Sequence, residues 1–146
     1  MWLSVLAVLF SCADDTESQS DASDTVCIEE NCFLVDLAVS TEEKEQGLMG
    51  VQSLLEGEGM LFIYDAGSTH SFWMYQMLIE IDILWISEDS IVVGIEENVP
   101  ICVALPCEYY VSPEGVQFVL EVAAGQVKAK GILVGNGVAI DLKSGD

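Results

Sequence analysis

From residue 32 onward the chain is a succession of short apolar runs separated by turn-forming residues. "CFLVDLAV", "MLFIY" and "VQFVLEVAA" are three of these runs, and Gly, Pro, Asn, Asp or Ser residues stand between them. Many short β-prone segments with few helical ones are typical of an all-β sandwich or barrel. We therefore predict a mainly β domain, a compact sandwich or rolled barrel of about 7–9 short strands with one or two short helices.

Two segments break this pattern and predict helices. In "STEEKEQGLMG", Ser40 with Glu43 three residues later forms a capping-box signature, and Gly47 stands near the expected stop. "QVKAKGI" predicts a second short helix. By contrast, Glu88–Ser90 lies between two apolar runs and predicts a hairpin turn.

The stretch "SFWMYQM" carries large side chains at almost every position. If Ser71 to Met77 is one strand, its side chains alternate between two bulky faces, so we expect cover on both sides. One face would carry Trp73, Tyr75 and Met77, and the other Phe72 and Met74. Such a strand is either core packing or the wall of a pocket, because Trp and Tyr rings suit both.

The next run, "IEIDILWI", places acidic residues at its start. Ile79, Ile81, Ile83 and Trp85 share a face that we expect to be core. On the other face, Glu80 and Asp82 lie about 6.6 Å apart along a strand. Such a pair could hold a divalent cation such as Ca²⁺, or act as acid and base. Alternatively, Asp82 is a structural carboxylate that accepts hydrogen bonds from nearby backbone N–H groups.

The beginning of the chain has the composition of an export signal. Residues 1–11, "MWLSVLAVLFS", are uncharged and too short to cross a bilayer, as in a signal peptide. The stretch "LFSC" resembles a lipobox, which predicts lipidation of Cys12 and anchoring to a lipid bilayer; Ala13 favours an outer membrane if the cell has two. Residues 12–25 are acidic and predict a disordered tether. Residues 26–146 form the predicted globular domain, facing the periplasm or the cell exterior.

The negative charge of the chain limits the classes of molecule that it can bind. The globular segment carries 20 acidic residues against four lysines and no arginine. Nucleic-acid binding needs clustered cations, so we exclude it. The acidity is either an adaptation to high salt or an attraction for a cationic partner or divalent metal.

Cysteines in the globular segment form two pairs with the same spacing. They are Cys27 with Cys32 and Cys102 with Cys107. In an exported protein an even number indicates disulfides, and we favour the two local bonds. A turn at Glu30-Asn31 would place the first pair opposite each other in a hairpin. Zinc binding is the alternative.

The sequence contains few residues and motifs of the kinds that enzymes use in catalysis. The chain has one histidine, His70, and lacks a G-x-S-x-G elbow and the Walker and Rossmann glycine patterns. His70, Met74 and Met77 are ligand types suited to copper, but His70 and Met74 would lie roughly 13 Å apart on a strand. We predict no cofactor, and we keep Glu80, Asp82 and His70 as weak candidates for a divalent cation.

Five motifs follow one another in the order and spacing of the Domain of Unknown Function 192 (DUF192) family, over about Phe33 to Leu142. They are "STEEKEQGLMG", "GEGMLFIY", "SFWM…LIEIDILWI", "IEENVP" and "FVLEVAAG". The chain therefore resembles that family, which implies a compact mainly β domain, often exported, without an established activity. This chain also differs from the pattern that the resemblance implies at three places. Where the family usually has Arg, this chain has Lys44, and where it usually has Lys-Asn, this chain has Tyr75-Gln76. Glu80 stands where the family usually has Pro. Any anion bound through those family cations would bind weakly here.

Three functional hypotheses follow. The first is a non-enzymatic envelope lipoprotein that binds an unknown protein or small ligand. Its candidate surface comprises Phe72, Trp73, Met74, Tyr75 and Asp82. The second is a metal-dependent or carboxylate-based enzyme using Asp82 and Glu80. The third and most distant is periplasmic copper binding.

Overall fold

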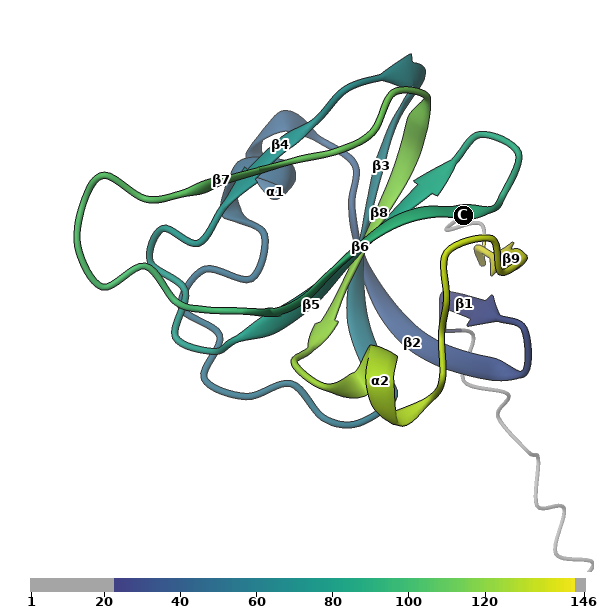
Figure 1. Cartoon of the computed structure of the whole chain (residues 1–146), viewed down its shortest axis with the longest axis horizontal. Helices are drawn as coiled ribbons and strands as arrows, with labels where there is room; N and C mark the ends of the chain where they lie inside the picture. The colour runs from purple at the N-terminus through teal and green to yellow at the C-terminus, as the bar shows by residue number, and fades with distance from the viewer. Residues whose placement is uncertain (1–22, 144–146) are drawn as a thin grey trace, which may run out of the picture.

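The computed structural model describes residues 23–143, and the lipidation site predicted at Cys12 lies outside them. Within this range the chain is mainly β, as predicted, with nine strands and two short helices. Seven strands form a curled sheet in the order β6-β5-β8-β3-β2-β1-β9, and β4 pairs with β7 in a separate two-stranded ribbon. In Figure 1 this ribbon and α1 lie toward one side of the sheet, and β1, β9 and α2 toward the other.

The strand and helix bounds are as follows, in chain order. β1 is Thr25–Ile28, β2 Asn31–Ala38, α1 Thr41–Gln46, β3 Glu58–Ser68, β4 Ser71–Trp73, β5 Ile81–Ser87, β6 Val92–Val99, β7 Tyr109–Val111, β8 Val116–Ala123, α2 Gln126–Ala129 and β9 Val138–Asp141. All strand pairs are antiparallel except β2 with β3. That parallel pair requires a crossover, and α1 with the loop after it provides one.

The helix α1 begins where the sequence predicted. The Glu43 backbone N–H donates to Ser40 Oγ at 3.2 Å, and the Ser40 N–H donates to Glu43 Oε2 at 2.8 Å. These reciprocal bonds satisfy N–H groups that have no partner inside a helix. They lower the pKa of the Glu43 carboxyl, with the bond from Ser40 as the main cause. The helix ends at Gly47, whose φ of +46° suits glycine.

Apolar side chains cover both faces of the central sheet. Leu61, Leu84 and Leu120 belong to one buried cluster, and Phe62 and Trp85 to the other. Strand β5 is buried from Ile81 to Ile86 without interruption, because it lies between β6 and β8 and is covered on both faces. Burial of this kind is the main favourable term in folding.

The prediction of one strand from Ser71 to Met77 is wrong beyond Trp73. The chain turns there, with Gln76 at a φ of +56° and the Met77 N–H donating to the Met74 carbonyl. The turn allows the Trp73 and Tyr75 rings to stack at 4.9 Å instead of pointing along one strand face. The predicted cover on both sides is also wrong, since 40% of Trp73 is exposed.

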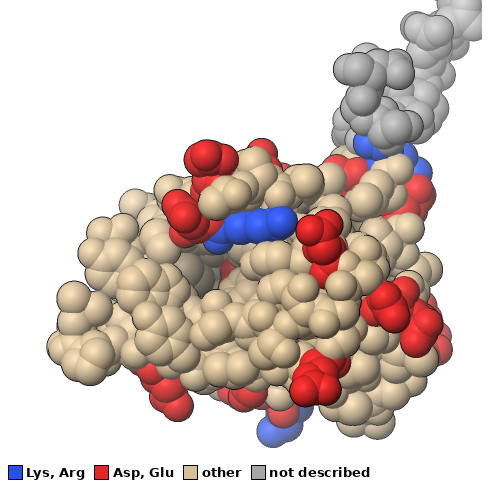
Figure 2. Space-filling view, turned by 90° about the horizontal axis from the view of Figure 1, so that it is seen from above, with Lys and Arg blue, Asp and Glu red and all other residues tan. Residues whose placement is uncertain are grey.

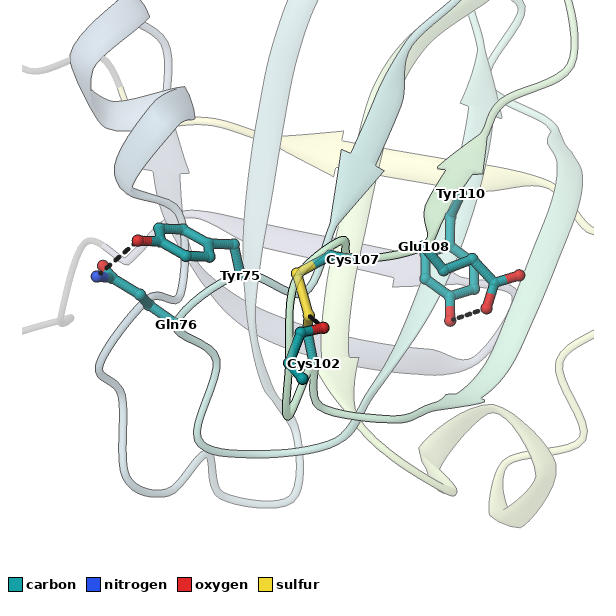
Figure 3. The surroundings of a disulfide bond; sticks show 7 residues. Tyr75, Gln76, Cys102, Cys107, Glu108 and Tyr110 are labelled. Atoms are coloured by element: carbon teal, nitrogen blue, oxygen red, sulfur yellow. Dashed lines mark hydrogen bonds between the residues drawn. A yellow bond between two sulfur atoms is a disulfide. The ribbon is translucent and has the colours of Figure 1, made fainter.

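Both local disulfides are present. Cys27 and Cys32 are paired across the β1–β2 hairpin, although its turn is at Glu29-Glu30, one residue earlier than predicted. Cys102 and Cys107 close the loop between β6 and β7 (Figure 3). Two disulfides indicate an extracellular or periplasmic location. Among the helices of residues 23–143, none is long and apolar enough to cross a membrane.

Removing either disulfide should cost about 2 kcal/mol in the free energy of unfolding, because each closes a short loop in the unfolded chain. The two bonds span the same sequence separation of 5, so the chain-entropy account predicts equal losses. Urea unfolding of the Cys27→Ser/Cys32→Ser and Cys102→Ser/Cys107→Ser proteins measures both. An unchanged midpoint for either protein would contradict the expectation for that bond.

Candidate functional site

A cavity of about 730 Å³ lies between the central sheet and the layer formed by α1, its following turn and β4. Phe62 and Tyr64 of β3 and Glu121 of β8 line it from the sheet. The covering layer contributes the following lining residues: Thr41, Lys44, Glu45, Gln46, Gly47, Leu48, Met49, Ser71, Phe72, Trp73, Tyr75 and Met77. Figure 2 shows a hollow in this face, with a cationic side chain lying along its edge. The volume lies within the range of small-molecule sites.

Aromatic rings dominate the wall and rim of the cavity. Phe72 packs edge-to-face on Phe62, with centroids 5.0 Å apart. At the rim, Trp73 stacks between Tyr75, at 4.9 Å, and Tyr109 of β7, at 5.7 Å. We call these three residues the aromatic rim. Figure 3 shows that the Tyr75 hydroxyl also accepts a hydrogen bond from Gln76, at 3.4 Å. Trp73 and Tyr75 line the cavity and Tyr109 continues the stack outside it, so the aromatic rim is a partly exposed aromatic surface beside the cavity.

Glu121 is the buried acid of the cavity. It lies in β8 between Met60 of β3 and Ile83 of β5, and only 5% of it is exposed. Within residues 23–143, no side chain or backbone group forms a hydrogen bond or an ion pair with its carboxyl. Burial raises the pKa of Glu121 to about 8, because a charged carboxylate is poorly solvated there. Near pH 7 it is therefore mainly a neutral acid.

Tyr64, Lys44 and His70 form a stack beside Glu121. Lys44 Nζ lies 4.4 Å above the Tyr64 ring centroid, which is a cation–π contact. His70 stacks on the same ring at 3.7 Å, and its Nε2 lies 3.2 Å from the Val116 carbonyl oxygen. Burial, and then the negative charge of Glu121, raise the pKa of Tyr64 to about 12. Burial also lowers the pKa of His70, so His70 acts as a neutral packing partner of Tyr64.

The residues of the predicted candidate surface lie in three different places. Phe72, Trp73 and Tyr75 line the cavity, whereas Met74 is buried beside the Cys102–Cys107 loop. Asp82 lies on the opposite face of the sheet. Its register partner there, Val122, belongs to the other core cluster.

Asp82 is a structural carboxylate that accepts hydrogen bonds from backbone N–H groups, which is one of the roles considered for it from the sequence. It is fully buried, its Oδ1 accepts the Asn98 N–H at 2.7 Å, and its Oδ2 accepts the Val127 N–H at 3.0 Å. These bonds tie β5 to β6 and to the first turn of α2. Glu80 is exposed and lies outside the cavity lining. The two carboxylates therefore do not share a cavity.

The metal candidates are not brought together. His70 is held in the Tyr64 stack, Asp82 by backbone N–H groups on the other face, and Glu80 is exposed. Within the described part of the chain, no group of three or more His, Cys, Asp or Glu residues could hold a metal ion. Met77 lines the cavity, but His70 and Met74 are outside its lining, so the copper set is also dispersed.

Sequence reasoning missed Glu121 and Tyr64. A usable signal was present in "VQFVLEVAA", where Glu121 is the one charged residue inside an otherwise apolar run. In a strand whose neighbours are Val119, Leu120 and Val122, such an acid is expected to be buried. Burial without a partner is what distinguishes it from the surface acids.

A model of the DUF192 family, described as "Uncharacterized ACR", matches residues 24–140. Two solved structures are similar over most of their length. A protein of unknown function from Novosphingobium aromaticivorans DSM 12444 is 27% identical, with a TM-score of 0.72 over 80% of this chain and 83% of that one. A protein from Sinorhizobium meliloti 1021, provisionally described as a transcription regulator, is 31% identical, with a TM-score of 0.72 over 82% and 94%. No curated protein matches.

Proposed function

This chain belongs to the DUF192 family, and from its cavity we propose that it is an exported, non-enzymatic domain that binds a small, largely apolar ligand. The observation that carries the proposal is the buried carboxyl of Glu121 in the wall of an aromatic cavity. A buried polar group without a partner costs free energy. Folded proteins leave few such groups unpaired, and an acid whose pKa is shifted by burial in a cavity is a candidate for a functional role.

The shape and lining of the cavity support a binding role. Ligand sites are mostly apolar and contain a few polar groups that fix the orientation of the ligand. Here Phe62, Phe72 and Trp73 supply apolar surface, while Lys44 and Glu121 supply the polar groups. The alternative of an enzyme built on Asp82 and Glu80 loses its geometric basis, because those residues do not meet in the cavity.

Binding can be tested with N-phenyl-1-naphthylamine, a neutral apolar dye whose fluorescence rises in apolar surroundings. We expect one saturable site in the purified domain. Because Ser71 lines the cavity, Ser71→Trp should fill part of it and weaken dye binding at least about tenfold. Leu133→Trp, at an exposed position outside the cavity, is the matched control and should bind like the wild type. Equal dye binding by both variants would overturn the proposal.

The second part of the proposal is attachment to a lipid bilayer through a lipidated Cys12, supported by the sequence "LFSC" and the acidic segment after it. The high negative charge of the chain repels anionic headgroups, so the lipid must supply the attachment. In a cell fractionation, we expect the wild type in the membrane fraction and Cys12→Ser outside it. Membrane retention of the Cys12→Ser protein would refute the lipid anchor and leave the binding proposal intact.

A further inference from the structure

We propose that the ligand of this cavity carries an organic ammonium group, which pairs with the Glu121 carboxylate while an apolar body lies against the aromatic wall. This inference rests on the proposed function and names the chemical class of its ligand. The structure brings together three features that such a ligand would use: a buried acid, a ring of aromatic faces, and a strongly acidic protein around them.

The first feature is the location of Glu121. Its carboxyl belongs to the cavity lining, yet it is buried and has no partner within residues 23–143 among the hydrogen bonds and ion pairs found there. An ammonium group entering the cavity would supply the missing opposite charge. Charge-assisted bonds of this kind are stronger than neutral ones, and more so away from water.

The second feature is the set of aromatic faces around the acid. Ammonium groups, including quaternary ones, bind over the faces of Trp, Tyr and Phe rings. The protein already makes such a contact in this cavity, because Lys44 Nζ lies 4.4 Å above the Tyr64 ring. The further rings in the lining are those of Phe62, Phe72, Trp73 and Tyr75.

The third feature is the charge of the whole chain. With a formal net charge of −21, the protein raises the local concentration of cations and repels anions. Lys44 is the one cationic side chain among the cavity-lining residues. It makes no ion pair within the described part of the chain, so Glu121 is not already neutralised by it.

Binding would be coupled to release of a proton. The titratable groups that line the cavity with Glu121 are Tyr64 from β3, Lys44 and Glu45 from α1, and Tyr75 from the covering turn; His70 stacks on Tyr64. Burial keeps the Glu121 carboxyl neutral near pH 7, since it raises the pKa to about 8. On binding a cation, the carboxyl loses its proton to solvent and the carboxylate pairs with the ammonium. Affinity should therefore rise by up to about tenfold per pH unit below pH 8.

Three probes with the same tail separate the ligand classes: octyltrimethylammonium, 1-octanol and octanoate. Isothermal titration calorimetry of the wild-type domain near pH 7, in phosphate and in Tris, measures affinity and proton release together. We expect octyltrimethylammonium to bind at least about tenfold more tightly than the other two. We also expect its heat to differ between the buffers by the amount that corresponds to nearly one released proton.

Two variants give opposite expected results. Glu121→Gln should weaken octyltrimethylammonium about tenfold or more and abolish the pH dependence, because the amide cannot ionise. Lys44→Gln should strengthen it a few-fold, because a neighbouring like charge is removed. Glu42→Gln, on the same helix but exposed and outside the cavity lining, is the control and should change the affinity least.

The outcomes separate this inference from the proposed function. Tighter binding of octanoate, together with its loss in Lys44→Gln, would show an anion site and overturn the ammonium inference alone. Equal binding of all three probes without proton release would show a purely apolar site, with the same consequence. If none of the three binds and the dye does not bind either, both proposals fail.

Discussion

The Glu121→Gln domain is expected to lose much less stability than the wild type as the pH rises from about 5 to 8. Burial raises the pKa of Glu121 from an ordinary value of 4.5 to about 8 in the folded protein. Between these values the folded state holds a proton that the unfolded state has released. The wild type is therefore stabilised below pH 4.5 and loses this contribution as the pH rises through 8.

The expected difference is large. Linkage gives a slope of up to about 1.4 kcal/mol per pH unit for one such group. Urea unfolding of both proteins at several pH values measures it directly. Glu88→Gln, at an exposed turn position between β5 and β6, removes a surface charge and should keep the wild-type slope. If the Glu121→Gln and wild-type curves run parallel, the carboxyl is not held neutral by burial.

The Asp82→Asn domain is expected to be less stable than the wild type by about 3 kcal/mol. The two carboxylate oxygens accept different backbone N–H groups, from Asn98 at 2.7 Å and from Val127 at 3.0 Å. An amide has one accepting oxygen, so one buried N–H would face an NH₂ group. Removing one partner of a buried bond costs more than the bond contributes.

The matched control for this change is Glu80→Gln, two residues earlier and exposed, which should alter stability by less than about 0.5 kcal/mol. Thermal and urea unfolding measure both variants. The folded Asp82→Asn protein should keep the dye affinity of the wild type, because Asp82 lies on the face away from the cavity. A lost affinity with little change in stability would show that Asp82 belongs to the binding site.

Much of the fold could be predicted because its signals are local. The capping box of Ser40 and Glu43, the turn at Glu88–Ser90 and the paired cysteines each involve residues close together in the chain. Alternation of side chains also identified Ile81, Ile83 and Trp85 as core. Where prediction failed, between Trp73 and Met77, a turn and stacked aromatic rings outweighed the strand preference of aromatic residues.

The candidate site was harder to predict because it depends on pairing between distant strands. Phe72, Trp73 and Tyr75 were identified from their rings, but their common cavity needs β3, β4 and β8 to be placed together. Asp82 and Glu121 are both acids in apolar runs. Only their register in the sheet shows that they face opposite sides, one toward backbone N–H groups and the other toward the cavity.

The position of β8 has a consequence for how the chain can fold after synthesis. This strand lies between β3 and β5, yet it follows both in the sequence and ends at Ala123 (Figure 1). During synthesis from the N-terminus, β3 and β5 are therefore made before β8, the strand that lies between them in the sheet. The central sheet cannot close, and the cavity cannot acquire Glu121, until β8 is present. Pairing between strands that are distant in the sequence slows folding, so formation of β8 is expected to limit how fast the central sheet assembles.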